Sequence, residues 1–440
     1  MLLGTKDTSV APAPIESKPD SVNILLFLVC GFGFILFSNS FNSLFLYGSE
    51  DSGAVSLPLQ LIRFSIYSLF IGLCAGMVLI QKPIFSVMGP ILIALLVFVV
   101  LSVLWSISPK NTLIRTYGLL GSTLMGIFMA SVFSWRNFFR LSLYSYLIII
   151  ILTFLLCIAL PSIGIHNGDE HNGAWRGAFG QKNVMGRMMA IGFILLFSGR
   201  NIFVGIEKIL AKLGMSGCIL LVVLSTSITA AVTLIVLALL SLILPLLLKN
   251  RAFFFSGLIF IFMMTVIVFG MFSDQFFEAF YSATGKDMTL TGRTDIWATA
   301  IRLWLNHNAL LGYGYGAFWS TDEGSRTAYW GMEDYVPPHA HNGLIGLSTE
   351  LGWIGLCLII MFLFGAFRIC WRHTCENRNN IASLPLVFFV AFVLLNISEV
   401  NMLVQKNLIW IIFVYVAARA RIDIKGVKPA EDRVRKLKRL

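Results

Sequence analysis

Charged residues are scarce in this sequence, and their scarcity excludes most classes of soluble protein. Only 12% of the 440 residues are Asp, Glu, Lys or Arg, whereas a soluble globular protein carries roughly 25%. Hydrophobic residues make up 57% of the chain, and the mean hydropathy is +0.83. The apolar runs do not alternate with polar residues as the strands of a membrane barrel do. The composition therefore predicts an all-α polytopic membrane protein.

Three further features are missing. The seven cysteines avoid the large outward loops, so no disulfide framework is expected. The first apolar run is too long for a signal peptide and has no convincing cleavage site. No segment repeats at an interval of about 20–50 residues, and the two halves lack the inverted symmetry of many transporters.

Long apolar stretches, by contrast, are abundant. A spanning helix needs about 20 such residues, and we predict about 12 transmembrane helices with one long loop between helices 9 and 10. The boundary at residues 225–227 is the least secure, since the two stretches beside it could be one broken helix. The predicted spans are 22–46, 58–80, 84–104, 111–133, 138–160, 182–199, 206–225, 227–248, 252–272, 342–367, 381–398 and 403–420.

The loops between these spans alternate in charge. Loops such as 249–251 and 368–378 are basic, whereas the intervening ones, including 169–170 and the polar insert 273–341, are neutral or acidic. Because basic loops stay in the cytoplasm, both termini are expected there and the insert on the periplasmic side. Five regions result: a disordered cytoplasmic tail (1–21), helices 1–9 (22–272), a periplasmic loop with amphipathic helices (273–341), helices 10–12 (342–420) and a basic cytoplasmic tail (421–440).

The formal charge of +11 does not indicate nucleic-acid binding. Residues 419–440 hold nine basic and three acidic residues, and therefore carry +6 of that charge. A basic tail after a final helix is the usual cytoplasmic anchor beside anionic membrane lipid.

Several cations break the charge rule, because they lie at or just beneath the predicted outer face. An arginine within a membrane costs roughly 2.5–3.5 kcal/mol on insertion scales, so a group of them at one depth needs partners. Ion pairs with Glu350, Glu399 or Asp295 are one explanation. For the whole group an anionic ligand such as a lipid-linked diphosphate is the better one, since guanidinium groups bind phosphate oxygens in pairs. The cations are Arg63, Arg115, Arg176, Lys182, Arg187 and Arg293.

The polar insert is rich in aromatic residues. Apolar side chains recur at helical spacing from Gly292 to Asn308, with Thr294 or Asp295 as the helix cap. Thirteen aromatic residues lie between positions 273 and 340. They suit either an aromatic belt at the membrane interface or stacking on sugar rings, and the sequence does not separate the two.

Histidines gather in the outward loops, and His339 and His341 follow two prolines directly before a predicted span. A histidine there can act as a general base that takes a proton from a sugar hydroxyl, or it can cap the helix. Glu350 lies nine residues beyond His341, about 180° around a regular helix. It is expected to neutralise an outer arginine or to be a second candidate base. His166 and His171, beside two acids, form a weaker candidate metal site.

Four segments can be compared with known patterns. His341-Asn342, Gly352 and Gly355 match His-[Asn/Ser/Gln]-x9-Gly-x-x-[Gly/Thr/Tyr], and Gly292-Arg293 with Trp297 matches Gly-Arg-x-x-x-Trp. The segment from Trp175 to Asn183 and the turn from Trp105 to Pro109, followed by Arg115, also fit. Together they resemble the O-antigen ligase and polymerase superfamily, the Wzy/WaaL-type membrane glycosyltransferases. The Trp175–Asn183 segment is most similar to the exopolysaccharide-production polymerase branch.

One position departs from the superfamily. Many of its members have a cation after a serine at the junction of the seventh and eighth helices, whereas Ser227 is followed here by Ile228. If that cation holds phosphate, another must replace it, and Arg187 is a candidate.

The resemblance implies a GT-C-like glycosyltransferase of the bacterial inner membrane whose active site faces the periplasm. It implies a metal-independent reaction, with no cofactor and no nucleotide sugar. The donor would be a glycan on undecaprenyl diphosphate, held by Arg115, Arg176, Lys182, Arg187 and Arg293. His341 would be the base or would orient the acceptor, and His339, Glu350 and Arg293 are the other candidate catalytic residues.

The acceptor separates the remaining alternatives. Another lipid-linked repeat makes the protein a polymerase, which the Trp175–Asn183 segment favours. Lipid A core makes it an O-antigen ligase, and a protein acceptor makes it a protein O-oligosaccharyltransferase. A flippase or transporter of lipid-linked glycan is the alternative from a different class.

Overall fold

The structure, a computed structural model, consists of helices joined by turns. It describes residues 23–45, 56–80, 87–167, 172–247, 293–321, 324–325, 336–377 and 381–425. Within these ranges there is no strand, and one isolated backbone bridge joins Ile165 to Trp175. The predicted all-α class is confirmed for this part of the chain.

The described helices follow one another with short connections. In chain order they are α1 (Ile24–Phe37), α2 (Asn42–Phe45), α3 (Leu57–Leu79), α5 (Pro90–Leu101), η2 (Ser102–Leu104), α6 (Pro109–Val132), α7 (Trp135–Ala159), α8 (Pro161–Gly164), η3 (Gly177–Phe179), α9 (Lys182–Gly199), α10 (Ile206–Leu224), α11 (Ile228–Leu247), α13 (Arg293–Asn308), η4 (Phe318–Ser320), α14 (Gly343–Glu376), α15 (Leu384–Ser398) and α16 (Leu408–Ile424).

Eleven of the twelve predicted spans overlap described helices, and the first, 22–46, contains both α1 and the short α2. The ninth, 252–272, lies outside the described residues, as does the part of the insert before Arg293. Helices α3, α6, α7 and α14 are long and apolar enough to cross a membrane, and α1, α5, α11 and α15 are shorter apolar helices. The turn at 225–227 separates α10 from α11. The number of spans and the side that each loop faces stay predictions.

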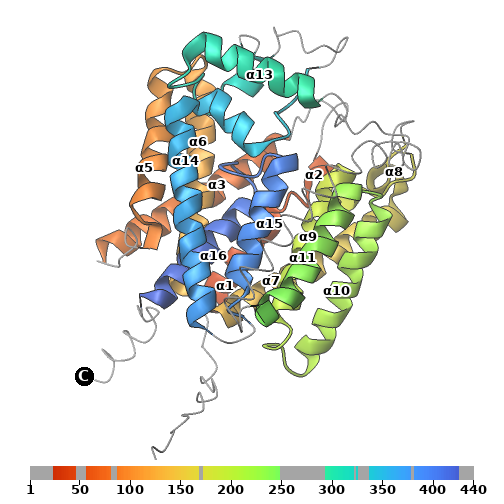
Figure 1. Ribbon diagram of the computed structural model, residues 1–440. Coiled ribbons are helices and arrows are strands. Elements are labelled where there is room, and N and C mark those ends of the chain that lie inside the picture. The colour runs from red at the N-terminus through yellow and green to blue at the C-terminus, as the bar shows by residue number, and fades with distance from the viewer. Residues whose placement is uncertain are drawn as a thin grey trace, which may run out of the picture.

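Helix α16 lies at the centre of the bundle, packed between α6 and α14. Its side chains, Trp410 and Phe413 among them, are buried on nearly every face. The outer helices instead expose apolar side chains, such as Leu61 on α3 and Leu213 on α10, which is the surface that lipid requires. Figure 1 shows α13 lying across one end of this bundle, above α14, with α9, α10 and α11 grouped at its side.

Helix α14 is broken at Gly352. This residue has φ +63° and ψ −166°, a conformation that is essentially restricted to glycine. The break frees backbone donors and acceptors on both sides of it, and inside a membrane bundle such groups need other partners. Gly352 is also the first fixed glycine of the pattern that begins at His341. The pattern therefore has a glycine at the position where the backbone takes this conformation.

The segment 309–316, which we call the strap, supplies those partners. It runs from the end of α13 along the broken part of α14, and it donates two backbone hydrogen bonds and accepts two. The four bonds run from Tyr313 N–H to Thr349 O (3.0 Å), Gly314 N–H to Glu350 O (2.9 Å), Trp353 N–H to Ala309 O (2.9 Å) and Ile354 N–H to Leu310 O (3.2 Å). The strap therefore completes the helix that Gly352 interrupts.

The other side of the strap is fastened to the turn between α5 and α6. The Trp105 indole N–H donates to the Leu311 carbonyl at 3.0 Å, and the Ile107 N–H donates to the Tyr313 carbonyl at 3.1 Å. The Tyr315 N–H donates to Ser102 Oγ at 3.1 Å. The Trp105–Pro109 turn of the sequence comparison thus positions the strap.

Candidate active site

The turn 336–342, which we call the histidine turn, leads into α14. Its last residue, Asn342, is the helix cap: Oδ1 accepts the N–H groups of Leu344 and Ile345 at 3.0 and 3.1 Å. The capping role that the sequence left open for a histidine therefore belongs to Asn342. His341 has φ +49°, which is uncommon for a residue with a side chain and stores strain where it occurs.

Helix α13 holds the histidine turn in place. The Trp297 indole N–H donates to the carbonyl of Ala340, between the two histidines, at 2.8 Å. Arg293 lies four residues before Trp297, and its charge acts on His339. Because residues i and i+4 share one face of a helix, the Gly-Arg-x-x-x-Trp segment delivers an anchor and a cation to the same turn.

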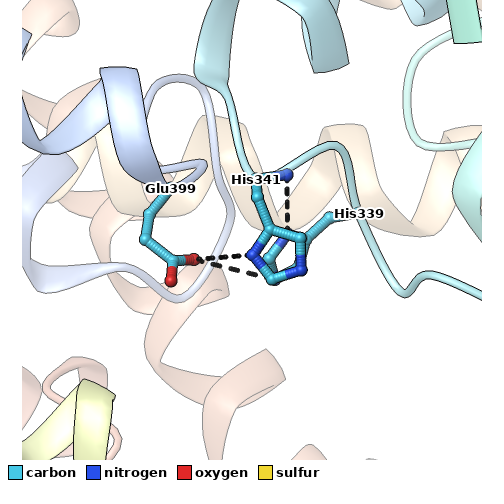
Figure 2. A group of neighbouring side chains, drawn as sticks. All are labelled: His339, His341 and Glu399. Atoms are coloured by element: carbon cyan, nitrogen blue, oxygen red, sulfur yellow. Dashed lines mark hydrogen bonds and ion pairs between the residues drawn. The ribbon is translucent and has the colours of Figure 1, made fainter. Parts of the chain in front are cut away.

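Glu399, in the connection between α15 and α16, is the residue on which the site converges. Its Oε2 lies 3.8 Å from His339 Nε2 and 3.8 Å from His341 Nδ1, as Figure 2 shows. The guanidinium of Arg187, on α9, lies 3.5 Å from the same oxygen. The backbone N–H of His341 donates to His339 Nδ1 at 3.2 Å. Three separate parts of the chain thus meet at one carboxylate.

Burial and charge set the protonation of this cluster. Burial alone would raise the pKa of Glu399, but Arg187 and the two histidines outweigh it and hold that pKa well below its usual range. Burial lowers the pKa of His339 to about 4; His341, Arg187 and Arg293 act in the same sense and Glu399 in the opposite one. Near pH 7 Glu399 is therefore ionised and His339 neutral. Since His339 Nδ1 accepts a hydrogen bond, its proton sits on Nε2, facing Glu399.

Two imidazoles and a carboxylate also make a possible metal-ligand set, because their ligand atoms lie within 4.8 Å of one another. However, the Arg187 guanidinium lies 3.5 Å from the carboxylate oxygen that a metal would share, and it would repel a divalent cation there. The cluster fits an anion beside Arg187 and a proton acceptor at His341 better than it fits a metal. The expectation of a metal-independent reaction stays a prediction.

A cavity of about 170 Å³ lies beside the cluster and shares His339 with it. Arg115 of α6 and Glu350 of α14 line this cavity, with Tyr315 of the strap. Glu350 is only 7% exposed, and Arg115 is the charged group that acts on it. Glu350 thus lies within electrostatic reach of an outer arginine and borders the same space as His339. Its two expected roles, neutralising that arginine or acting as a second base, stay predictions.

Parts of the chain are similar in sequence to known proteins. Residues 213–360 match the family model described as O-Antigen ligase. An 89-residue stretch, 19% of this chain, is 39% identical to the exopolysaccharide production protein ExoQ of Rhizobium meliloti (strain 1021). The predicted resemblance to the O-antigen ligase and polymerase superfamily is confirmed. The match covers 20% of the length of that relative.

The region that matches the superfamily model contains most of the site described above. It runs from α10 through α13, the strap and the histidine turn to the broken part of α14. Arg187, Arg115 and Glu399 lie outside it and come from α9, α6 and the connection between α15 and α16. The structure therefore joins residues of the matched region to residues that the family model does not reach.

This chain has Ile228 where many superfamily members have a cation, but a lysine from another helix lies close to that position. Lys182, at the start of α9, places Nζ 3.4 Å from Thr226 Oγ1 in the turn between α10 and α11. Arg187, the replacement expected from the sequence, instead pairs with Glu399. Lys182 is thus the cation that lies beside the Ser227-Ile228 position.

Arg176 is held within its own segment of the chain. Its guanidinium donates to the carbonyls of Ile163 and Ser162 at 2.9 and 3.1 Å. Of the five predicted diphosphate ligands, the structure brings Arg187 and Arg293 to the histidine turn and Arg115 to the adjoining cavity.

His166 and His307 also have structural contacts. His166 Nε2 accepts the backbone N–H of Lys182 at 3.3 Å. His307 stacks on Tyr313, with 3.9 Å between the ring centroids. His171 and the two acids beside it lie outside the described residues, so the metal site suggested for them stays a hypothesis.

Sequence reasoning gave Glu399 too small a role. It appeared only as a possible ion-pair partner, whereas the structure makes it the shared neighbour of both histidines and Arg187. Tyr315 and Gln405, which line the cavity, were not singled out for the site at all. The available signal was an acidic residue in a very short loop between two predicted apolar spans.

Proposed function

We propose that this protein is a glycosyltransferase of the bacterial inner membrane that transfers a glycan from undecaprenyl diphosphate to an acceptor hydroxyl at the periplasmic face. The observation that carries the proposal is the convergence of two histidines and Arg187 on Glu399. The superfamily resemblance supports the substrate class. The alternating charge of the loops supports the periplasmic placement of the insert 273–341.

His341 is the proposed general base. Glu399 faces its Nδ1 and favours the tautomer that carries a proton there, which leaves Nε2 to accept a proton from the acceptor hydroxyl. His339 suits this role less well, because its Nδ1 already accepts the His341 N–H and its Nε2 faces Glu399. We assign His339 to positioning His341.

The reaction is a single displacement at the anomeric carbon. The acceptor oxygen forms a bond to that carbon, its proton passes to His341, and the bond from carbon to the diphosphate oxygen breaks. The electron pair leaves on undecaprenyl diphosphate, whose added charge the cations stabilise. In-line attack of this kind inverts the anomeric configuration, and it needs no metal, cofactor or nucleotide sugar.

Arg187 and Arg293 are the cations best placed to hold the diphosphate, because both act on the histidine cluster. A guanidinium binds phosphate oxygens in pairs, and Arg187 keeps its other contact with Glu399 while doing so. Arg115, Arg176 and Lys182 remain proposed as further contacts along the lipid-linked glycan.

For the acceptor, we favour another lipid-linked repeat, so that the product is a longer polysaccharide. The Trp175–Asn183 segment and the relative named for exopolysaccharide production both support this choice. The description of the matching family model supports the alternative, in which a ligase joins the glycan to lipid A core.

The test is a gel of surface polysaccharide from a deletion strain complemented with wild type, Arg293→Ala or His341→Ala. Both variants are expected to fail. His341→Ala loses a positioned base, which contributes about 10²–10⁴-fold, and Arg293→Ala loses a cation that stabilises the charge of the leaving diphosphate. Arg302→Ala on the exposed face of α13 and His307→Ala are the matched controls. The wild type and all four variants must first be shown to be present in the membrane.

The banding pattern separates the two acceptors. Single repeats on lipid A core indicate a lost polymerase, whereas bare core with accumulated lipid-linked polymer indicates a lost ligase. Wild-type banding from both Arg293→Ala and His341→Ala refutes the proposed site and favours a transporter.

A further inference from the structure

The cavity beside the strap has a wall of mixed chemistry that the displacement reaction does not use. Glu350 and Arg115 supply charged groups, Gln405 an amide, and Tyr315 and Trp319 aromatic rings. One water needs about 10–15 Å³ of such space, and the cavity offers about 170 Å³. That volume is enough to hold a sugar ring.

Glu350 is held firmly at this wall. Its backbone carbonyl accepts the Gly314 N–H of the strap at 2.9 Å, and both Arg115 and the backbone of Gly316 act on its carboxylate. Gly316 has φ +68°, and a Cβ there would collide with the Arg115 side chain. The strap therefore fits closely over Arg115, and the carboxylate is fixed before any ligand arrives.

A carboxylate buried inside a membrane bundle needs a reason to be there. Burying a carboxylate costs free energy unless its oxygens find partners, and ionisable residues inside membrane segments mark functional sites by default. A carboxylate accepts hydrogen bonds from sugar hydroxyls, an arginine and an amide donate to sugar oxygens, and aromatic faces pack against C–H groups. The cavity brings all of these groups together.

The cavity also extends to the histidine cluster. His339 lines it, while His339 Nε2 lies 3.8 Å from Glu399 in the histidine cluster. A sugar seated against Glu350 therefore ends beside the proposed base and the cations Arg187 and Arg293. We propose that this cavity is a subsite for one sugar residue of the glycan substrate, with Glu350 and Arg115 as its binding groups. The proposal rests on the function proposed above.

The experiment uses purified full-length protein in detergent. The donor is the lipid-linked repeat isolated from the deletion strain, and the acceptor is the same repeat released from its lipid by mild acid. The variants are Glu350→Gln, which keeps the shape of the side chain, and Leu347→Phe, which adds volume at a buried position on the cavity wall. Glu207→Gln is the matched control. Glu207 is likewise a buried carboxylate near an arginine, Arg140, but it lies on α10 and does not line the cavity.

Glu350→Gln is expected to raise KM for one substrate roughly tenfold, the effect of losing a hydrogen bond to a charged group, and to change kcat less. Leu347→Phe is expected to raise the same KM, and Glu207→Gln neither. A raised KM for the released repeat, which has no diphosphate and can only accept, assigns the sugar to the acceptor. A KM raised only for the lipid-linked repeat, measured with the released repeat saturating, assigns it to the donor. Thermal unfolding of each variant identifies any that has lost its fold. Glu350→Gln removes a charge and Leu347→Phe adds volume, so a raised KM in both has the cavity as its common cause.

Two outcomes are distinguishable from failure of the proposed function. If His341→Ala loses turnover while both cavity variants keep the wild-type KM values, the sugar subsite is refuted and the glycosyltransferase stands. If His341→Ala and Arg293→Ala keep full turnover, the proposed function itself is refuted.

Discussion

Replacing Gly352 by alanine should uncouple the strap from α14. At this φ and ψ a residue with a side chain costs about 1–3 kcal/mol. The new Cβ would also collide with the Leu310 carbonyl and lie 2.6 Å from the Leu311 N, so the strap must move. Losing the two bonds that the strap accepts from Trp353 and Ile354 removes about 1–3 kcal/mol more. The free energy of unfolding should therefore fall by about 2–6 kcal/mol.

The assay is thermal unfolding of the purified protein in detergent, followed by transferase activity at a permissive temperature. The control is Gly365→Ala in the same helix, where the nearest atom to a new Cβ is Ile91 Cδ1 at 3.8 Å and φ is not positive. This control should unfold at or slightly above the wild-type temperature, since alanine favours a helix by up to about 1 kcal/mol over glycine. Equal unfolding temperatures for the two variants would refute the role assigned to the strap.

Three further predictions concern the histidine turn. Glu399→Gln should lower kcat roughly 10²-fold, because His341 loses the group that orients it; activity within twofold of wild type would contradict this. Trp297→Phe should lower activity severalfold, because it loses the hydrogen bond to the Ala340 carbonyl. Trp304→Phe loses a similar hydrogen bond to the Ala309 carbonyl and should lower the unfolding temperature more than the activity. A larger loss of activity from Trp304→Phe than from Trp297→Phe would contradict the anchoring role of Trp297. His339 has a folded pKa of about 4, below its ordinary value of 6.5, so the unfolded chain takes up the proton first and stability should fall as pH drops from 6.5 to 4. Unfolding temperatures of wild type and His339→Gln over that range test this, and parallel curves would exclude His339 as the source.

Composition and periodicity were enough to predict the fold class and the positions of most helices. Apolar runs of membrane length leave the chain few alternatives to helices, because backbone groups in lipid must be satisfied internally. Motif spacing likewise singled out His341 and Arg293, whose catalytic roles stay predictions. The ion pair expected for an outer cation is present at Arg187, which lies 3.5 Å from Glu399. These are features that each segment determines by itself.

The parts that escaped prediction depend on contacts between distant segments. Gly352 was recognised as part of a pattern, but nothing in the sequence says that its backbone bonds go to residues 309–314. Glu399 gains its importance only when α15 brings it to Arg187 and the histidine turn. A helical wheel placed Glu350 opposite His341, and it could not show that Glu350 shares a cavity with His339.

The broken helix has a consequence for how the protein is made. Synthesis reaches the strap before it reaches α14, because residues 309–316 precede Gly343. An interrupted helix that entered lipid alone would leave backbone groups unsatisfied, each at a cost of several kcal/mol. The strap can meet those groups as soon as the helix arrives. Biogenesis of this region is therefore ordered by the chain itself.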